Sequence, residues 1–125
     1  MTWRQCAGAP APGTPLCRAD AIADGEAKNF IFGAGSERFE MFVVRAANGL
    51  FAYVNECPHT GTTLDFLPNR FFTQDKKLLL CSTHGARFRI ADGACVAGPC
   101  AGRGLIPVPV EVLAGEIRIG HDGRG

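Results

Sequence analysis

Apolar and polar residues alternate in short runs along much of this chain, and that period of two is typical of β-strands. Phe39–Arg45 and Leu50–Asn55 are two such runs, and Asn48 and Gly49 lie between them. Asn-Gly between two strand-like runs is a strong hairpin signal, because both residues tolerate the positive φ that a tight hairpin turn needs. The pattern therefore predicts an antiparallel strand pair here.

Further runs of the same kind follow along the chain. The other strands are expected at Asn29–Phe32, Lys77–Leu80, Arg87–Ile90, Leu105–Leu113 and Glu116–Ile119, with tight turns at Asp92-Gly93 and Ala114-Gly115. Pro107 and Pro109 cannot donate to a strand ladder, so their strand should lie at an edge or pair irregularly. No stretch sustains helical periodicity beyond a turn or two. Short strands at regular spacing predict an all-β fold, an antiparallel β-sandwich or small barrel.

Two pairs of metal-ligand residues interrupt this strand pattern. Cys57-Pro-His59 and Cys81-Ser-Thr-His84 are separated by residues 60–80, and each pair supplies one thiolate and one imidazole. A Cys₂His₂ set can bind one zinc ion, but zinc sites usually pair like ligands, as C-x₂₋₄-C and H-x₃₋₅-H. One Cys and one His in each loop suit a cluster of two chemically different irons better. Zinc stays the less favoured alternative, and four unrelated buried residues are the least favoured one.

The segments around these pairs resemble the cluster loops of Rieske-type [2Fe-2S] ferredoxins, the soluble kind found in ring-hydroxylating dioxygenase systems. Asn55–Leu64 resembles the first cluster loop, Leu80–Phe88 the second, and Gly93–Leu105 the third, proline-containing loop that covers the cluster. The resemblance runs from about Leu16 to Ile119. It implies one [2Fe-2S] cluster per chain, held by loops at one end of a Rieske-type β-sandwich.

By position, the resemblance assigns Cys57 and Cys81 to the inner iron, and His59 and His84 to the outer, solvent-facing iron through Nδ1. Candidates to exclude water around the cluster are Pro58, Leu64, Phe66 and Pro99.

Four substitutions separate this chain from the high-potential members of the family. Thr62 and Thr83 stand where those members carry the cysteines of a loop-tying disulfide, so that tie is absent. Ala86 and Phe88 stand where they carry Ser and Tyr, whose hydroxyls donate to sulfur and stabilise the reduced cluster. Rieske centres span about −150 to +300 mV. Without these donors, we expect a potential near the lower end of that range.

Composition narrows the class of protein further. The chain has 125 residues, a net charge of +1 and three His. Because the cluster uses two of them and leaves only His121, a 2-His-1-carboxylate oxygenase iron cannot be built. No basic run indicates nucleic acid, and no run approaches the roughly 18–20 apolar residues of a membrane span. These features predict a cytoplasmic protein with no nucleic-acid or membrane partner.

The expected organisation is a flexible leader over residues 1–15, a Rieske [2Fe-2S] domain over 16–120 and a flexible tail over 121–125. Cys95 and Cys100 do not match the family's disulfide positions, so we expect small thiols beside the cluster rather than a redox pair.

The leading prediction is a one-electron carrier and not an enzyme: a ferredoxin that passes electrons from a reductase to a terminal oxygenase or similar acceptor. One alternative is a small subunit of a larger oxidoreductase such as nitrite reductase. Another is a zinc-stabilised interaction module without a redox role.

Overall fold

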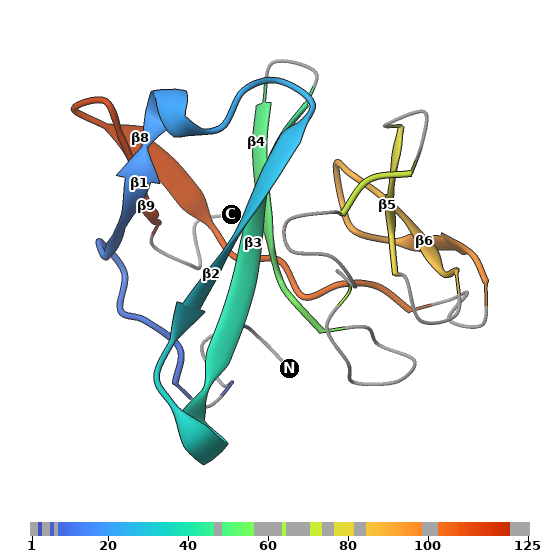
Figure 1. The fold of residues 1–125 in the computed structure, drawn as a ribbon, viewed down its shortest axis with the longest axis horizontal. Helices are drawn as coiled ribbons and strands as arrows, with labels where there is room; N and C mark the ends of the chain where they lie inside the picture. The colour runs from blue at the N-terminus through green and yellow to red at the C-terminus, as the bar shows by residue number, and fades with distance from the viewer. Residues whose placement is uncertain are drawn as a thin grey trace.

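The structure is a computed structural model that describes residues 3, 6, 8–46, 49–56, 64, 71–73, 77–81, 85–98 and 103–120. Within these residues the chain forms nine strands and two short 3₁₀ helices, η2 (Ala19–Ala21) and η3 (Gly35–Glu37). The strands form three antiparallel sheets of three strands each (Figure 1), which confirms the predicted all-β class. No helix in this part of the chain is long and apolar enough to cross a membrane.

The central sheet is a meander of β2 (Glu26–Phe32), β3 (Phe39–Ala46) and β4 (Gly49–Val54). The pairing of Ala46 with Gly49 confirms the predicted hairpin, although Asn48 lies outside the described residues. Strand β2 begins three residues earlier than predicted, because Glu26 to Phe32 all pair in register with β3.

Strand β3 is buried on both faces, because it separates two hydrophobic cores. Successive side chains of a strand point to opposite faces. Met41 and Val43 accordingly belong to one core, and Phe42 and Val44 to the other. All four side chains are fully buried. Burial on both faces explains why this run is almost continuously apolar rather than strictly alternating.

The second sheet has the order β1 (Pro15–Arg18), β9 (Glu116–Ile119), β8 (Val110–Leu113). Prediction of one strand over Leu105–Leu113 was wrong for its first half, where Pro107 makes only an isolated bridge to Tyr53. The expected effect of the prolines is confirmed, since regular pairing begins only after Pro109 and β8 lies at the sheet edge. The predicted turn at Ala114-Gly115 is present, with φ of 55° and 77°.

Strand β1 was not predicted, because four residues without clear alternation carry little signal. It continues a packed segment that includes described residues of the expected leader. Trp3 is 3% exposed and packs with the core between the first two sheets, and the Gly13 N–H donates to the Ile119 carbonyl at 2.7 Å. The division at residue 15 stays a prediction, but these described residues contribute to the body of the domain.

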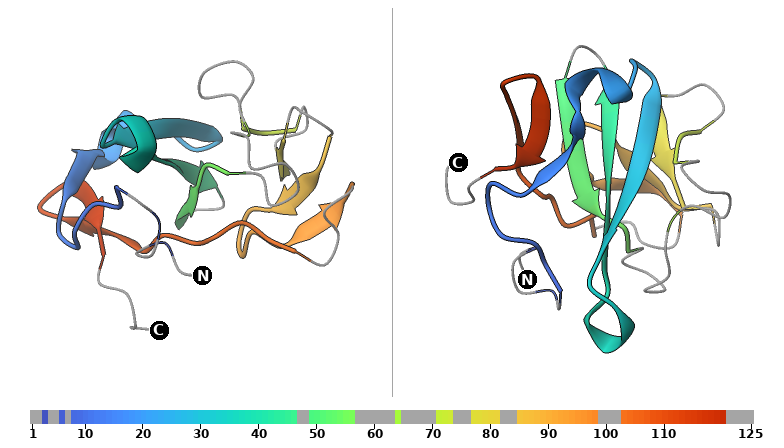
Figure 2. Two further views of the ribbon diagram at one scale, coloured as in Figure 1. Left: turned by 90° about the horizontal axis from the view of Figure 1, so that it is seen from below. Right: turned by 60° about the vertical axis from the view of Figure 1, so that its left-hand side comes forward.

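The third sheet has the order β5 (Leu78–Leu80), β6 (Arg87–Arg89), β7 (Cys95–Ala97). Figures 1 and 2 show it as a separate lobe, on the other side of the central sheet from β8 and β9. The core that contains Phe42 and Val44 fills the space between this lobe and the central sheet. The rings of Phe42 and Phe71 stack there at 4.2 Å between centroids. Strand β7 was not predicted, because its three residues lie within a glycine-containing loop sequence.

Tyr53 of β4 connects this lobe to the central sheet. Its hydroxyl donates to the Ile90 carbonyl at 2.6 Å, just after β6. A Cβ at Gly93 would lie 2.7 Å from the Tyr53 ring, and Gly93 has a φ of 73°. Only glycine satisfies both conditions, which confirms the predicted turn at Asp92-Gly93.

Candidate metal centre

The third sheet and the end of β4 carry the segments in which the candidate ligands were predicted. Of the four, Cys81 is described, whereas Cys57, His59 and His84 lie outside the described residues. The candidate water-excluding residue Leu64 is described and fully buried; Pro58, Phe66 and Pro99 are outside that part of the chain. Described residues lie at the base of each of the three loops.

The second ligand loop is closed at its base by two hydrogen bonds. Cys81 directly follows β5 and is fully buried in the core beneath the third sheet. Its N–H donates to the Ala86 carbonyl at 2.8 Å, and the Gly85 N–H donates to the Cys81 carbonyl at 3.0 Å. Gly85 has a φ of 74°, which glycine adopts without steric cost. The chain thus leaves the core at Cys81 and is back in it at Ala86, and His84 belongs to the sequence between these two residues.

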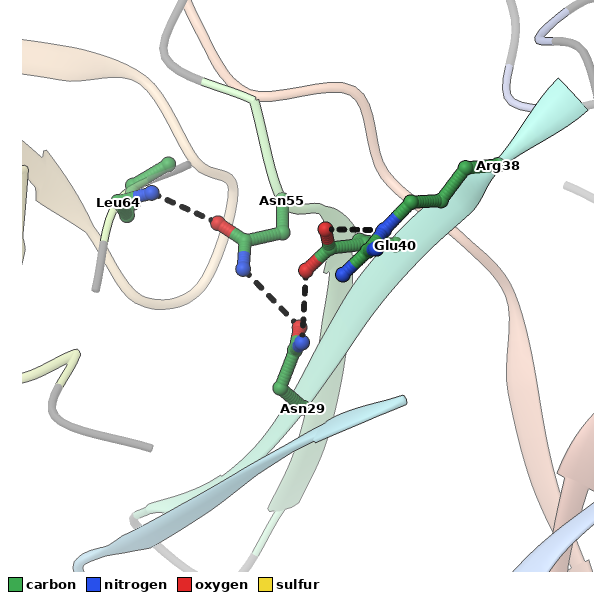
Figure 3. A network of polar contacts seen from close by, with 5 residues as sticks. All are labelled: Asn29, Arg38, Glu40, Asn55 and Leu64. Atoms are coloured by element: carbon green, nitrogen blue, oxygen red, sulfur yellow. Dashed lines mark hydrogen bonds and ion pairs between the residues drawn. The ribbon is translucent and has the colours of Figure 1, made fainter. Parts of the chain in front are cut away.

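The first ligand loop is closed at its base by a side chain. Asn55 follows β4 and is 4% exposed. Its Oδ1 accepts a hydrogen bond from the N–H of Leu64 at 2.8 Å (Figure 3). Its backbone N–H donates to the Glu40 carbonyl at 2.8 Å. The segment between Asn55 and Leu64, which contains Cys57 and His59, is therefore anchored at both ends.

The third loop approaches the second through a glycine. A Cβ at Gly98 would lie 2.7 Å from the Ala86 Cα, so a side chain there would collide with the backbone of the second loop. Within the third loop, the Cys95 N–H donates to the Arg103 carbonyl at 2.9 Å. These contacts place the base of the third loop beside Ala86. Cys95 itself is buried, and its Sγ lies 3.3 Å from the Ala97 carbonyl as a donor; Cys100 is not among the described residues.

Ala86 and Phe88 are both fully buried at the second loop. Neither side chain carries a hydroxyl, so these two positions contribute no hydrogen bond to sulfur. Both residues belong to the same core as Cys81.

Two groups near the β6–β7 turn have shifted pKa values. The hydrogen-bonded ion pair with Arg89, at 2.6 Å, and the Ala94 N–H hold the pKa of Asp92 at about 2. Burial, and next the negative charge of Asp92, raise the pKa of Tyr53 to about 12. Tyr53 is therefore a neutral hydrogen-bond donor at physiological pH, and it supports the lobe that carries Cys81.

The polar residues that support the first loop were not predicted from the sequence. Asn29 of β2 and Glu40 of β3 extend the contacts of Asn55 into the central sheet (Figure 3). One signal was available, because Glu40 is a charged residue within the largely apolar run Phe39–Val44. Burying such a residue is costly unless it has a partner.

The described residues fit a [2Fe-2S] cluster. A buried thiol at Cys81 suits an inner iron, and hydrogen bonds close the bases of the two segments whose sequences contain the Cys-x-His and Cys-x-x-His pairs. Cysteine and histidine on separate loops form the ligand set of a mixed-ligand cluster.

Comparison with known proteins gives an independent result. The model of the Rieske [2Fe-2S] domain matches residues 13–113, a span that includes all four candidate ligands. No curated protein sequence was found to match the chain.

Solved structures share the fold. Sphingomonas yanoikuyae B1 ferredoxin is 26% identical, with 87% of this chain and 98% of that chain covered and a TM-score of 0.65. The ferredoxin of carbazole 1,9a-dioxygenase from Nocardioides aromaticivorans IC177 is 24% identical, with 88% and 98% covered and a TM-score of 0.66. The terminal oxygenase of carbazole 1,9a-dioxygenase from the same organism is 20% identical, with 91% and 31% covered and a TM-score of 0.72. The family match extends over most of the chain, and the chain therefore belongs to the family of Rieske [2Fe-2S] domains.

Proposed function

We propose that this protein is a one-electron carrier, the ferredoxin component that passes electrons from a reductase to a terminal oxygenase or similar acceptor. The observation that carries the proposal is the family match over residues 13–113. The structural neighbours support it, because nearly the whole of two ferredoxins aligns with this chain, whereas less than a third of the oxygenase does.

The proposed ligands are Cys57 and Cys81 for one iron, and His59 and His84 for the other. When bound, the cluster supplies reversible one-electron chemistry at a potential that its surroundings adjust. The chain's own residues hold the site: Cys81 is fixed by the Ala86 carbonyl, and Leu64 closes the first loop against the core. Ala86 and Phe88, which follow the second ligand pair in the second loop, favour a potential near the low end of the Rieske range.

The proposed acceptor is an oxygenase, since two of the ferredoxin-containing structures are named for carbazole 1,9a-dioxygenase. The proposed exit route for the electron is the His-ligated side of the cluster, because the imidazoles face solvent in this assignment. We propose a cytoplasmic location, in keeping with Cys ligands that need a reducing compartment to remain thiols before the cluster is inserted.

The decisive experiment is an EPR spectrum of the dithionite-reduced protein with iron and zinc measured on the same sample. We expect about two irons per chain and a rhombic signal whose average g value lies below that of all-Cys clusters. A silent spectrum with about one zinc per chain would instead identify a structural zinc site.

Co-purification then separates a carrier from an enzyme subunit. A carrier binds its partners transiently and elutes alone, while a subunit of a larger oxidoreductase such as nitrite reductase stays in a stable complex. Reduction by a flavin reductase, followed by reoxidation upon mixing with a terminal oxygenase, completes the test of the proposed role.

A further inference from the structure

A line of hydrogen bonds runs from the central sheet to the first ligand loop (Figure 3). Glu40 accepts from the Asn29 Nδ2 at 3.0 Å, and Asn29 Oδ1 accepts from the Asn55 Nδ2 at 3.0 Å. Asn55 Oδ1 in turn accepts from the Leu64 N–H at 2.8 Å. At the other end, Arg38 Nε donates to Glu40 at 2.9 Å. Side chains of β2, β3 and the end of β4 are thereby joined to the residue at which the loop returns to the core.

The two ends of this line determine the orientation of both amides. A carboxylate can only accept, and a backbone N–H can only donate. Asn29 must therefore turn its NH₂ group toward Glu40, which leaves its oxygen for Asn55. Asn55 must then turn its NH₂ group toward Asn29, which leaves its oxygen for Leu64. The acceptor-only carboxylate of Glu40 and the donor-only N–H of Leu64 thus agree on which atom Asn55 presents to the loop.

Burial makes the last of these contacts important. Leu64 is fully buried and Asn55 is 4% exposed, so water cannot readily replace a lost partner. A buried N–H without a partner is costly. Asn55 stands two residues before Cys57, and Leu64 stands five residues after His59. One hydrogen bond therefore joins the two ends of the segment that carries both proposed ligands.

We propose that Asn55 is a positioning residue that holds the first ligand loop closed and so retains the cluster, and that Glu40 orients it through Asn29. This inference rests on the proposed function, because it takes Cys57 and His59 as ligands. It assigns a role in cluster retention to two residues of the central sheet, Asn29 and Glu40, that touch no ligand among the described residues.

The first test is the Asn55→Ala variant. Hydrogen exchange at the Leu64 amide should become about tenfold faster in the cluster-free protein, because the N–H loses its acceptor. The reconstituted variant should also release iron to a chelator faster than the wild type. Glu116→Gln is the control. It removes a carboxylate that pairs with Arg118 at 2.9 Å on β9, in the second sheet and away from the line of hydrogen bonds. It should change neither quantity.

The second test moves the carboxylate along the line. Asn55→Asp still accepts from Leu64, but it places a second carboxylate against Asn29, which can orient its NH₂ group toward only one of the two. Glu40→Gln alone should be nearly neutral, because its amide oxygen can still accept from Asn29. The double variant allows Asn29 to reverse, so that Gln donates to Asn29 and Asn29 donates to Asp. We therefore expect Asn55→Asp to release iron faster and the added Glu40→Gln to restore retention.

The double variant also moves a negative charge toward the first ligand loop, and the midpoint potential reports that move. Its negative charge stands two residues before Cys57 rather than in the central sheet. The midpoint potential should fall relative to the wild type, because the closer charge disfavours the added electron.

The outcomes separate this inference from the proposed function. A wild-type chain that takes up no [2Fe-2S] cluster would overturn both. A wild-type chain that takes up the cluster, with Asn55→Ala unchanged in Leu64 exchange and iron release, would overturn only the role of Asn55. Failure of Glu40→Gln to rescue Asn55→Asp would overturn the orienting role of Glu40. Because the Asp variants retain an acceptor for Leu64, they keep the test meaningful if Asn55→Ala does not fold.

Discussion

At the scale of single residues, two buried cysteines occupy the same core but differ in their proposed roles. Cys81 and Cys95 both pack in the core between the third sheet and β3. Only Cys81 follows β5 at the base of a ligand loop.

This difference gives a direct test of the ligand assignment. Cys81→Ser should lose the cluster and its EPR signal, because serine does not supply the thiolate that iron–sulfur clusters require. Cys95→Ser, at a position with similar burial, should keep about two irons per chain. Iron content and visible absorption after reconstitution measure how much cluster each variant holds. Equal iron in the two variants would contradict the assignment of Cys81.

The potential is a second property that depends on single residues. Ala86→Ser combined with Phe88→Tyr would place hydroxyl donors at the second loop. We expect the midpoint potential to rise within the span of about −150 to +300 mV that Rieske centres cover. The reason is that hydrogen bonds to sulfur stabilise the reduced, more negative cluster.

A control must show that the same chemical change elsewhere has no effect on the potential. The control variant, Ala27→Ser with Phe30→Tyr, adds the same two hydroxyls on β2, where both side chains are half-buried. Square-wave voltammetry of both double variants is the measurement. A midpoint that stays unchanged in the Ala86 and Phe88 variant would count against hydroxyl donors as the cause of the low potential.

At the scale of elements, the packing of the third loop on the second depends on Gly98. This residue has a φ of 96°, and a Cβ would lie 2.7 Å from the Ala86 Cα. Gly115 also has a positive φ, of 77°, but a Cβ there would meet no atom within 4 Å. Alanine at Gly115 would therefore cause backbone strain alone, whereas alanine at Gly98 would cause both backbone strain and a collision.

Gly115→Ala should cost about 1–2 kcal/mol in the free energy of unfolding, the cost of the left-handed conformation. Gly98→Ala should cost more and should also weaken cluster retention, since the loops must move apart. Urea unfolding and the rate of iron release measure the two effects. Equal destabilisation of the two variants with unchanged iron release would mean that this contact does not hold the loops together.

At the scale of the whole molecule, Tyr53 links the lobe of the third sheet to the central sheet. Its pKa of about 12 exceeds its ordinary value of 10. A raised folded-state pKa means that the folded protein holds the proton more tightly than the unfolded chain does. The resulting stability is fully present below pH 10 and is lost as the pH rises toward about 12.

Two measurements check this linkage. Since Tyr53 is the only tyrosine of the chain, ultraviolet titration of the folded protein reports its pKa without ambiguity. The loss of stability between pH 10 and 12, measured by urea unfolding, should be smaller in Tyr53→Phe. That variant should also be less stable near neutral pH by about 1 kcal/mol, because it loses the hydrogen bond to Ile90. An ordinary tyrosine pKa would show that the hydroxyl is not buried at this junction.

Local patterns were sufficient to predict much of this molecule. Alternation and the Asn48-Gly49 turn predicted the β3–β4 hairpin, and β9 was predicted with its observed bounds. The Cys-x-His and Cys-x-x-His pairs were sufficient to predict the Rieske family, because ligand type and spacing are properties of the chain itself. The assignment of the individual ligands stays a prediction.

Contacts between distant segments could not be predicted in the same way. Strands β1 and β7 are three or four residues long, and they are strands because β9 and β6 lie beside them. The roles of Asn29, Glu40 and Asn55 likewise depend on three separate segments meeting at one place. The sequence by itself determines residue type and spacing. The tertiary structure decides which buried polar groups become partners, because folding excludes water and leaves each group only the neighbours that the fold provides.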